Sequence, residues 1–148
     1  MNLDPALTGN GSPQVWFTRP AYDPLIIHDA DGKAVPGLAT EWGYSEDRLS
    51  FTLKLREGVK FSDGTELTAE GAVASMEYWK ANTQFGQYLA NVAEIVASGP
   101  MELTLKLSNP DPLLEYVLDQ NGQSGSIIGP KGLENPSMLG TESVGAGP

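Results

Sequence analysis

Several short groups of polar residues have types and spacings that could support chemistry. Asp29 and Asp31 precede Gly32, as acidic ligands do in a calcium-binding loop, where carboxylate oxygens coordinate the ion. Such a loop also needs a glutamate at its twelfth position, and that position, counted from Asp29, is Thr40. The Asp31-Gly32 pair, placed between two apolar stretches, therefore predicts a hairpin turn in preference to a calcium site.

A second group could belong to a hydrolase. Residues 62–65 read Ser-Asp-Gly-Thr, which has the composition of an aspartic-protease motif but the wrong order and no second copy. A tight turn closed by the Asp63 side chain explains them better. A Ser-His-Asp site would need a G-x-S-x-G nucleophile turn beside His28, the single histidine, and the sequence has none. We expect a satisfied or exposed His28 at a strand end, and no catalytic residue, metal site or cofactor.

The glycines of "TGNGSP" are a third candidate, this time for phosphate binding. Gly9 and Gly11 do not follow a strand or open a helix, as the loop of a dinucleotide-binding unit requires. A flexible loop is the preferred interpretation, and a ligand-contacting loop is the alternative.

Composition excludes several classes of partner. The net charge of −10 argues against nucleic acid and against anionic membrane surfaces, both of which need a basic face. No apolar run approaches the roughly 18 residues that span a bilayer, and Met1–Pro5 lack the basic and apolar regions of a signal peptide. The chain has no cysteine, so it contains neither disulfides nor thiolate metal ligands.

The elements that position these groups can be predicted from periodicity. Apolar residues alternate with polar ones over 49–56, which predicts a strand with one buried face. Further strands are expected over 25–28 and 38–45, over 93–108 as a pair joined at Gly99-Pro100, and briefly within 127–136. Thr68 is a good N-cap for a helix over 69–81, and Asp111 is predicted to cap a helix that Gly122 ends. A short helix or a turn is expected near 15–22, and a loop with a short helix within 81–92. The pattern predicts an α+β fold, mostly antiparallel sheet with helices packed on it.

The order of these features resembles a known family. "LDPAL", "AYDPLIIHDADGKAVPGLATEW", "LSFTLKLREGVKFSDGTELTAEGAVAS" and "SVGAGP" together are similar to the family 5 extracellular solute-binding proteins of bacterial ABC importers, the peptide-, dipeptide- and nickel-binding class. The chain departs from the family pattern at Gly71, where an aspartate is usual, and it stops at Pro148, whereas family members are several times longer. The family pattern is matched at Leu38, Ala39, Trp42, Phe51, Leu53, Leu55, Arg56, Val59, Lys60, Phe61, Asp63, Gly64, Thr65, Thr68, Ala69 and Ser75.

The resemblance implies a domain plan and a function. Residues 27–140 would form the smaller subdomain of lobe one of a type-II-like periplasmic binding protein. Residues 1–26 would belong to the main ligand-binding lobe, and 141–148 would lead back to it through a hinge. The intact protein would capture a peptide or other small solute between this lobe and a second one, which this chain lacks. It would then deliver the solute to an ABC permease, at the periplasmic or extracellular face of the membrane, with a lipid anchor as a possibility.

The resemblance also implies where the solute would be contacted. In family members the loop after "LDP" reaches the ligand cleft, and an aromatic residue near the position of Phe85 lies close to the ligand. The expected contact residues are Thr8, Gly9, Asn10, Gly11, Ser12 and Phe85. Two alternatives remain open: a protein-interaction domain, which an exposed apolar patch would favour, and a small carboxylate-based hydrolase, which paired acids with opposed pKa values would favour.

Overall fold

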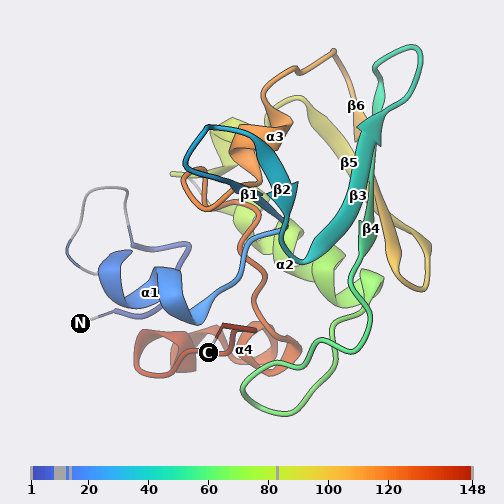
Figure 1. Ribbon diagram of the computed structural model, residues 1–148. Helices are drawn as coiled ribbons and strands as arrows, with labels where there is room; N and C mark the ends of the chain where they lie inside the picture. Colours follow the sequence, from blue (N-terminus) through green and yellow to red (C-terminus); the bar gives the residue numbers. More distant parts are fainter. Residues whose placement is uncertain (1, 9–12, 14, 83, 148) are drawn as a thin grey trace.

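The computed structural model describes residues 2–8, 13, 15–82 and 84–147 (Figure 1). A four-stranded antiparallel sheet has the order β3-β4-β6-β5, and a separate two-stranded sheet pairs β1 with β2. The prediction of an α+β fold is confirmed. The elements in chain order are α1 (Val15–Ala21), β1 (Ile26–His28), β2 (Ala34–Pro36), β3 (Ala39–Tyr44), β4 (Ser50–Leu55), α2 (Ala69–Ala81), the 3-10 helix η1 (Gly86–Leu89), β5 (Val92–Gly99), β6 (Glu102–Leu107), α3 (Leu114–Val117), α4 (Pro130–Glu134) and the 3-10 helix η2 (Pro136–Gly140).

The alternation over 49–56 forms β4, as predicted. Phe51 and Leu53 are fully buried, and they pair across the ladder with Leu105 and Leu103 of β6, which are buried too. Because side chains alternate across a strand, both strands turn the same apolar face inward. Helix α2 packs against this face, on β5 and β6 (Figure 1). The core therefore lies between the sheet and α2.

Helix α2 has the predicted bounds, because its start is fixed by a side chain. Thr68 Oγ1 accepts a hydrogen bond from the Gly71 backbone N–H at 3.1 Å, which satisfies one of the free donors of the first turn. Met76 and Trp79 lie on the buried face, with no exposed surface. Helical spacing thus places both side chains against the sheet.

The hairpin at Asp31-Gly32 is confirmed. Gly32 has φ 77°, a left-handed conformation that glycine adopts without steric cost. Asp29 Oδ1 accepts hydrogen bonds from the backbone N–H groups of Asp31 (3.0 Å) and Lys33 (2.9 Å). The Asp29 carboxylate is thus used to close the turn, and β2 occupies part of the segment that the sequence predicted as turn.

Two predictions for the region after β6 are corrected: one helix is shorter than expected, and one strand is absent. The helix expected after Asp111 reduces to the four residues of α3, and Leu113 at its N-cap position makes no side-chain capping hydrogen bond. Asp111 Oδ1 accepts only the nearby Leu113 N–H (3.0 Å), and at the other end Asp119 takes up backbone donors that would continue the helix. The strand expected within 127–136 is replaced by α4, which begins at Pro130, a residue with preset helical φ that suits the first helical position.

The segment before α4 is extended but lies outside any strand. Ile127 and Ile128 are fully buried, which explains why they read as strand residues. The Ile128 backbone N–H donates to Ser75 Oγ at 2.9 Å, and the Ile127 N–H donates to the Asp23 carbonyl at 3.2 Å. Side-chain and loop partners thus replace a ladder, so burial alone does not make this segment a strand.

Candidate functional site

The N-terminal segment that carries the expected contact residues is anchored by a buried aspartate. Asp4 is 1% exposed, its Oδ1 accepts a hydrogen bond from the Ala6 N–H at 2.9 Å, and its Oδ2 accepts one from the Tyr78 hydroxyl at 2.6 Å. Tyr78 belongs to α2, so this bond ties the segment to the main helix. Burial and the neighbouring Asp4 carboxylate raise the pKa of Tyr78 above its ordinary value, which keeps the hydroxyl a donor.

Thr8 ends the described part of this segment. It is buried, and its Oγ1 donates to the Pro5 carbonyl at 3.2 Å, which closes the local turn. The other four expected contact residues of the loop, Gly9, Asn10, Gly11 and Ser12, lie outside the described residues. Contact between Thr8 and a solute stays a prediction.

Phe85 lies in the core, 1% exposed. Its ring meets the Trp79 ring edge to face, with centroids 5.0 Å apart and an interplanar angle of 88°. Trp79 in turn donates through Nε1 to the Ser126 carbonyl at 2.8 Å. Among the described residues no hydrogen bond or ring contact joins Phe85 to Thr8. Solute contact by Phe85 also stays a prediction.

A small cavity lies beside the anchored N-terminal segment. Its volume is about 10 Å³, the space that one water molecule needs. The polar groups in its wall come from distant parts of the chain, from α1 and from the turn that follows α3. The lining residues are Pro5, Thr18, Arg19, Tyr22, Gln123 and Ser126.

Gln123 is a polar residue that the sequence prediction missed. It is 4% exposed, and neither Oε1 nor Nε2 has a hydrogen-bond partner among the described residues. The next residue, Ser124, is fully buried, and its Oγ also has no hydrogen-bond partner among the described residues. The available signal was the polar, glycine-rich run "DQNGQSGS" directly after an apolar helix, which the sequence prediction treated only as a helix end.

The turn that carries Gln123 is built on Asp119. Asp119 is 1% exposed, and its Oδ1 accepts hydrogen bonds from the backbone N–H groups of Asn121 and Gly122, both at 2.7 Å. The Gln123 N–H donates to the Asp119 carbonyl at 3.0 Å. The chain then folds back so closely that a Cβ on Gly125 would lie 2.0 Å from the Leu118 carbonyl oxygen. This turn therefore holds Gln123 in a fixed position at the cavity wall.

Tyr22 closes the cavity toward the C-terminal segment. It is 1% exposed, and its hydroxyl oxygen accepts the Val144 N–H at 3.3 Å. Burial raises the pKa of Tyr22 to about 12, so the hydroxyl stays protonated at neutral pH.

The Gly147 N–H donates to the Ala21 carbonyl at 3.1 Å, which brings the two ends of the chain to one side of the molecule (Figure 1).

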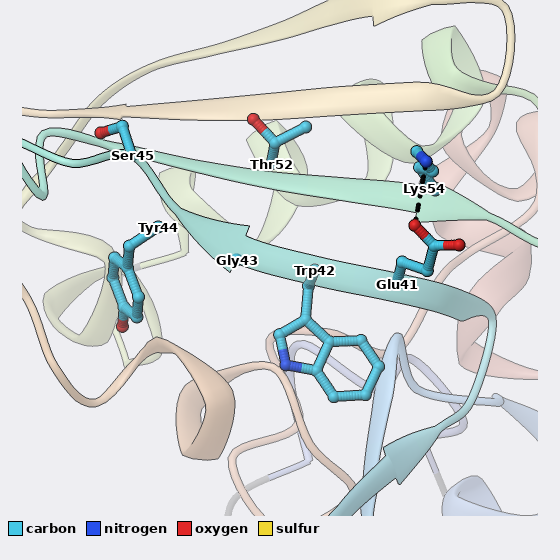
Figure 2. Close-up of a pocket in the computed structure, with 7 residues that line it drawn as sticks. All are labelled: Glu41, Trp42, Gly43, Tyr44, Ser45, Thr52 and Lys54. Carbon is cyan, nitrogen blue, oxygen red and sulfur yellow. Dashed lines mark hydrogen bonds and ion pairs between the residues drawn. The ribbon is translucent and has the colours of Figure 1, made fainter.

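A wider hollow follows the β3 edge of the sheet (Figure 2). Lys54 Nζ lies 2.9 Å from Glu41 Oε2, and both side chains are exposed, so solvent screens this ion pair. Trp42 points to the other side of the strand in Figure 2 and donates through Nε1 to Glu115 Oε1 at 2.8 Å. Tyr44 donates to the Asp111 carbonyl at 2.5 Å. Trp42 and Tyr44 thus hold α3 and the segment before it to the sheet. Among the described residues that line the hollow, no buried side-chain polar atom lacks a hydrogen-bond partner.

The turn prediction for residues 62–65 is confirmed. Asp63 Oδ1 accepts hydrogen bonds from the Thr65 N–H (2.8 Å) and the Thr65 hydroxyl (2.6 Å), and Gly64 has φ 84°. These hydrogen bonds lower the pKa of Asp63, although burial acts in the opposite sense. Burial raises the pKa of Asp23, which lines a cavity whose wall does not include Asp63. The two acids share no cavity wall, so they do not form the pair that a carboxylate-based hydrolase needs.

His28 is a satisfied residue at a strand end, as expected. Its Nδ1 lies 2.9 Å from Asp119 Oδ2, and its ring stacks on Tyr116 with centroids 4.5 Å apart. Within the described ranges no three His, Cys, Asp or Glu side chains are grouped so that they could hold a metal ion.

Comparison with known proteins decides the family. Residues 33–148 match the bacterial extracellular solute-binding proteins, family 5 Middle, which is more than half of the chain. The chain belongs to this family of solute-binding proteins. The resemblance seen in the motifs is thereby confirmed.

Known periplasmic binding proteins align with nearly the whole chain. A probable peptide ABC transporter periplasmic-binding protein, y4tO, of Sinorhizobium fredii is 30% identical over 99% of this chain and 27% of its own length. The nickel-binding periplasmic protein of Escherichia coli is 31% identical over 91% of this chain and 26% of its own length. The chain thus spans about a quarter of the length of the curated relatives it matches.

A solved structure supports the fold. NikA from Brucella suis, in complex with Fe(III)-EDTA, superposes with a TM-score of 0.79 at 28% identity, over 99% of this chain and 30% of NikA. The family and these relatives are named for solute binding and transport, not for catalysis. In the part of the chain that the structure describes, no helix is long and apolar enough to cross a membrane.

Proposed function

We propose that this protein is a substrate-binding component of a bacterial ABC importer, which captures a peptide or another small solute and delivers it to a membrane permease. The family match over residues 33–148 carries this proposal. Relatives named for peptide and for nickel binding support a solute of this range, and their periplasmic names support capture on the outer side of the cytoplasmic membrane. A lipid anchor would keep the protein there equally well.

The domain plan belongs to the same proposal. Residues 27–140 would act as the smaller subdomain of the first lobe, and residues 1–26 and 141–148 would contribute to the main ligand-binding lobe. Hydrogen bonds between the outer segments support this division: Gly147 N–H donates to the Ala21 carbonyl at 3.1 Å, and Val144 N–H donates to the Tyr22 hydroxyl oxygen at 3.3 Å. The sheet and α2 lie within the middle segment. Closure of two lobes on a solute is a hinge motion, so full affinity needs both lobes.

Isothermal titration with peptide mixtures tests the proposal. This chain alone should give no strong heat, because it spans only 27% of the peptide-transporter relative. A protein extended to the length of that relative should bind peptides. Absence of binding to peptides, nickel and other small solutes by the extended protein would refute the proposed function. Tight peptide binding by the present chain would refute the two-lobe explanation instead.

A further inference from the structure

Gln123 combines two energetic costs at one residue. Its buried amide has no hydrogen-bond partner among the described residues, and a buried polar group without a partner is unfavourable. Its backbone has φ 65°, a left-handed conformation that residues other than glycine rarely adopt. Buried unpaired groups and strained backbone both gather at functional sites, because binding a ligand repays their cost.

The cavity provides the space that such a ligand would fill. Gln123 lines it together with Arg19 and Tyr22, and the volume of about 10 Å³ admits one water molecule or one oxygen atom of a larger group. Arg19 lies in the last turn of α1 and is exposed to solvent, so the cavity wall reaches the surface there. A molecule outside could therefore insert a single oxygen between α1 and the turn at Gln123.

Arg19 brings a positive charge to the cavity wall. Within the described residues the Arg19 guanidinium has no ion pair and no hydrogen bond, although the chain carries a net charge of −10. The Asp4 carboxylate, whose charge acts on Tyr22 in the cavity wall, accepts hydrogen bonds from Ala6 and Tyr78, which partly stabilise that charge. Arginine offers a planar set of N–H donors that suits a carboxylate, and the glutamine amide adds two more donors.

We propose that this cavity is a carboxylate subsite, in which Arg19 and the Gln123 amide hold one carboxylate oxygen of an organic acid or of a peptide C-terminus. Asp119 acts as a positioning residue, because its carboxylate builds the turn that presents Gln123. The inference goes beyond the proposed transport function, because it names a binding group of this chain and the chemical group that it would hold.

Nuclear magnetic resonance titration of the chain tests the subsite directly. Acetate, added at constant ionic strength, should cause saturable shifts of the Gln123 side-chain amide and the Arg19 Nε–H signals. Acetamide, which has the same shape without the charge, should cause much weaker shifts. Dialanine and its C-terminal amide form a second pair of probes: a stronger response to dialanine than to acetate assigns the site to peptide termini, and an equal response assigns it to carboxylates in general.

Variants separate binding from folding. Arg19→Gln, on an exposed helix position, should weaken acetate binding about tenfold or more, as expected for hydrogen bonds to a charged group. Gln123→Gly, which suits the left-handed backbone, should weaken it in the same direction. Arg48→Gln removes one positive charge on a distant turn and is the matched control, which should bind acetate like the parent chain.

Three results would overturn the subsite: no saturable response to acetate, equal responses to acetate and acetamide, or an unchanged response in Arg19→Gln. A cavity that holds only water would give the first result. None of these results bears on solute capture by the extended protein, which peptide titration measures separately.

Discussion

His28 Nδ1 lies 2.9 Å from Asp119 Oδ2, across 91 positions of sequence, and both side chains are almost fully buried. An ionised carboxylate only accepts hydrogen bonds, so the imidazole donates through Nδ1–H. The Gln120 amide strengthens the same junction, since it donates to the His28 carbonyl at 2.8 Å and accepts the His28 N–H at 3.0 Å. The β1 strand is thereby fixed to the turn that carries Gln123.

This junction predicts that Asp119→Ala strongly destabilises the fold. The substitution removes the acceptor of the Asn121 and Gly122 N–H groups and leaves His28 without its partner. Each buried donor left unpaired costs about 1–3 kcal/mol, so the free energy of unfolding should fall by about 3 kcal/mol or more. Urea denaturation measures this change.

The matched control for Asp119 is Asp31→Ala. Asp31 is exposed, and no described hydrogen bond uses its side chain, so the free energy of unfolding should stay nearly constant. Equal stability losses in Asp119→Ala and Asp31→Ala would show that the His28–Asp119 junction does not stabilise the fold.

The cap of α2 gives a smaller, separately testable effect. Thr68→Ala removes the side-chain acceptor of the Gly71 N–H and should lower the free energy of unfolding by about 1 kcal/mol. Thr68→Ser keeps an equivalent hydroxyl and should lose much less. Thermal denaturation of both variants checks the prediction, which fails if alanine and serine are equally costly.

Periodicity predicted the central sheet and α2 well, because their burial is regular along the chain. Phe51, Leu53 and Leu55 alternate with polar residues, and Thr68 is a local capping signal, so tertiary contacts add little information there. The region after β6 failed for the opposite reason. Asp119 ends α3 early by accepting hydrogen bonds from its own neighbours, a competition that helix periodicity does not record.

The candidate site was only partly predictable. The family resemblance pointed to the loop that begins at Thr8, whereas the cavity beside it depends on Arg19 and Gln123, which are 104 positions apart in the sequence. No local pattern links these two residues. Buried, unpaired side chains become visible only when the fold has placed α1 against the turn at Gln123.

The anchor of the N-terminal segment predicts a coupling between Asp4 and Tyr78. Tyr78→Phe removes the hydroxyl that donates to Asp4 Oδ2 and should cost about 1–3 kcal/mol, because the carboxylate stays buried with one partner fewer. Asp4→Ala, which removes the acceptor of the Tyr78 hydroxyl, should also destabilise the fold. The double variant should lose less than the sum of the two single losses, since both remove one interaction. Additive losses in this double-mutant cycle would contradict the anchor.

Tyr22 predicts a loss of stability at alkaline pH. Burial raises its pKa from 10.0 to about 12 in the folded protein, whereas the unfolded chain releases the proton near 10.0. Because deprotonation then favours the unfolded state, the contribution is fully present below pH 10 and is lost as the pH rises toward 12. The shift corresponds to about 2–3 kcal/mol. Urea denaturation across this pH range should show the loss in the parent chain.

Tyr22→Phe isolates this contribution from the other groups that titrate at alkaline pH. The variant loses the acceptor of the Val144 N–H, so its stability at neutral pH should be lower by about 1 kcal/mol. Its further decline above pH 10 should be shallower than that of the parent chain, because the buried hydroxyl is gone. Tyr78, whose pKa is raised mainly by burial and by Asp4, is present in both proteins, so only the smaller part of its shift that comes from Tyr22 differs between them. Parallel curves for the two proteins above pH 10 would mean that Tyr22 is not protected from ionisation by the fold.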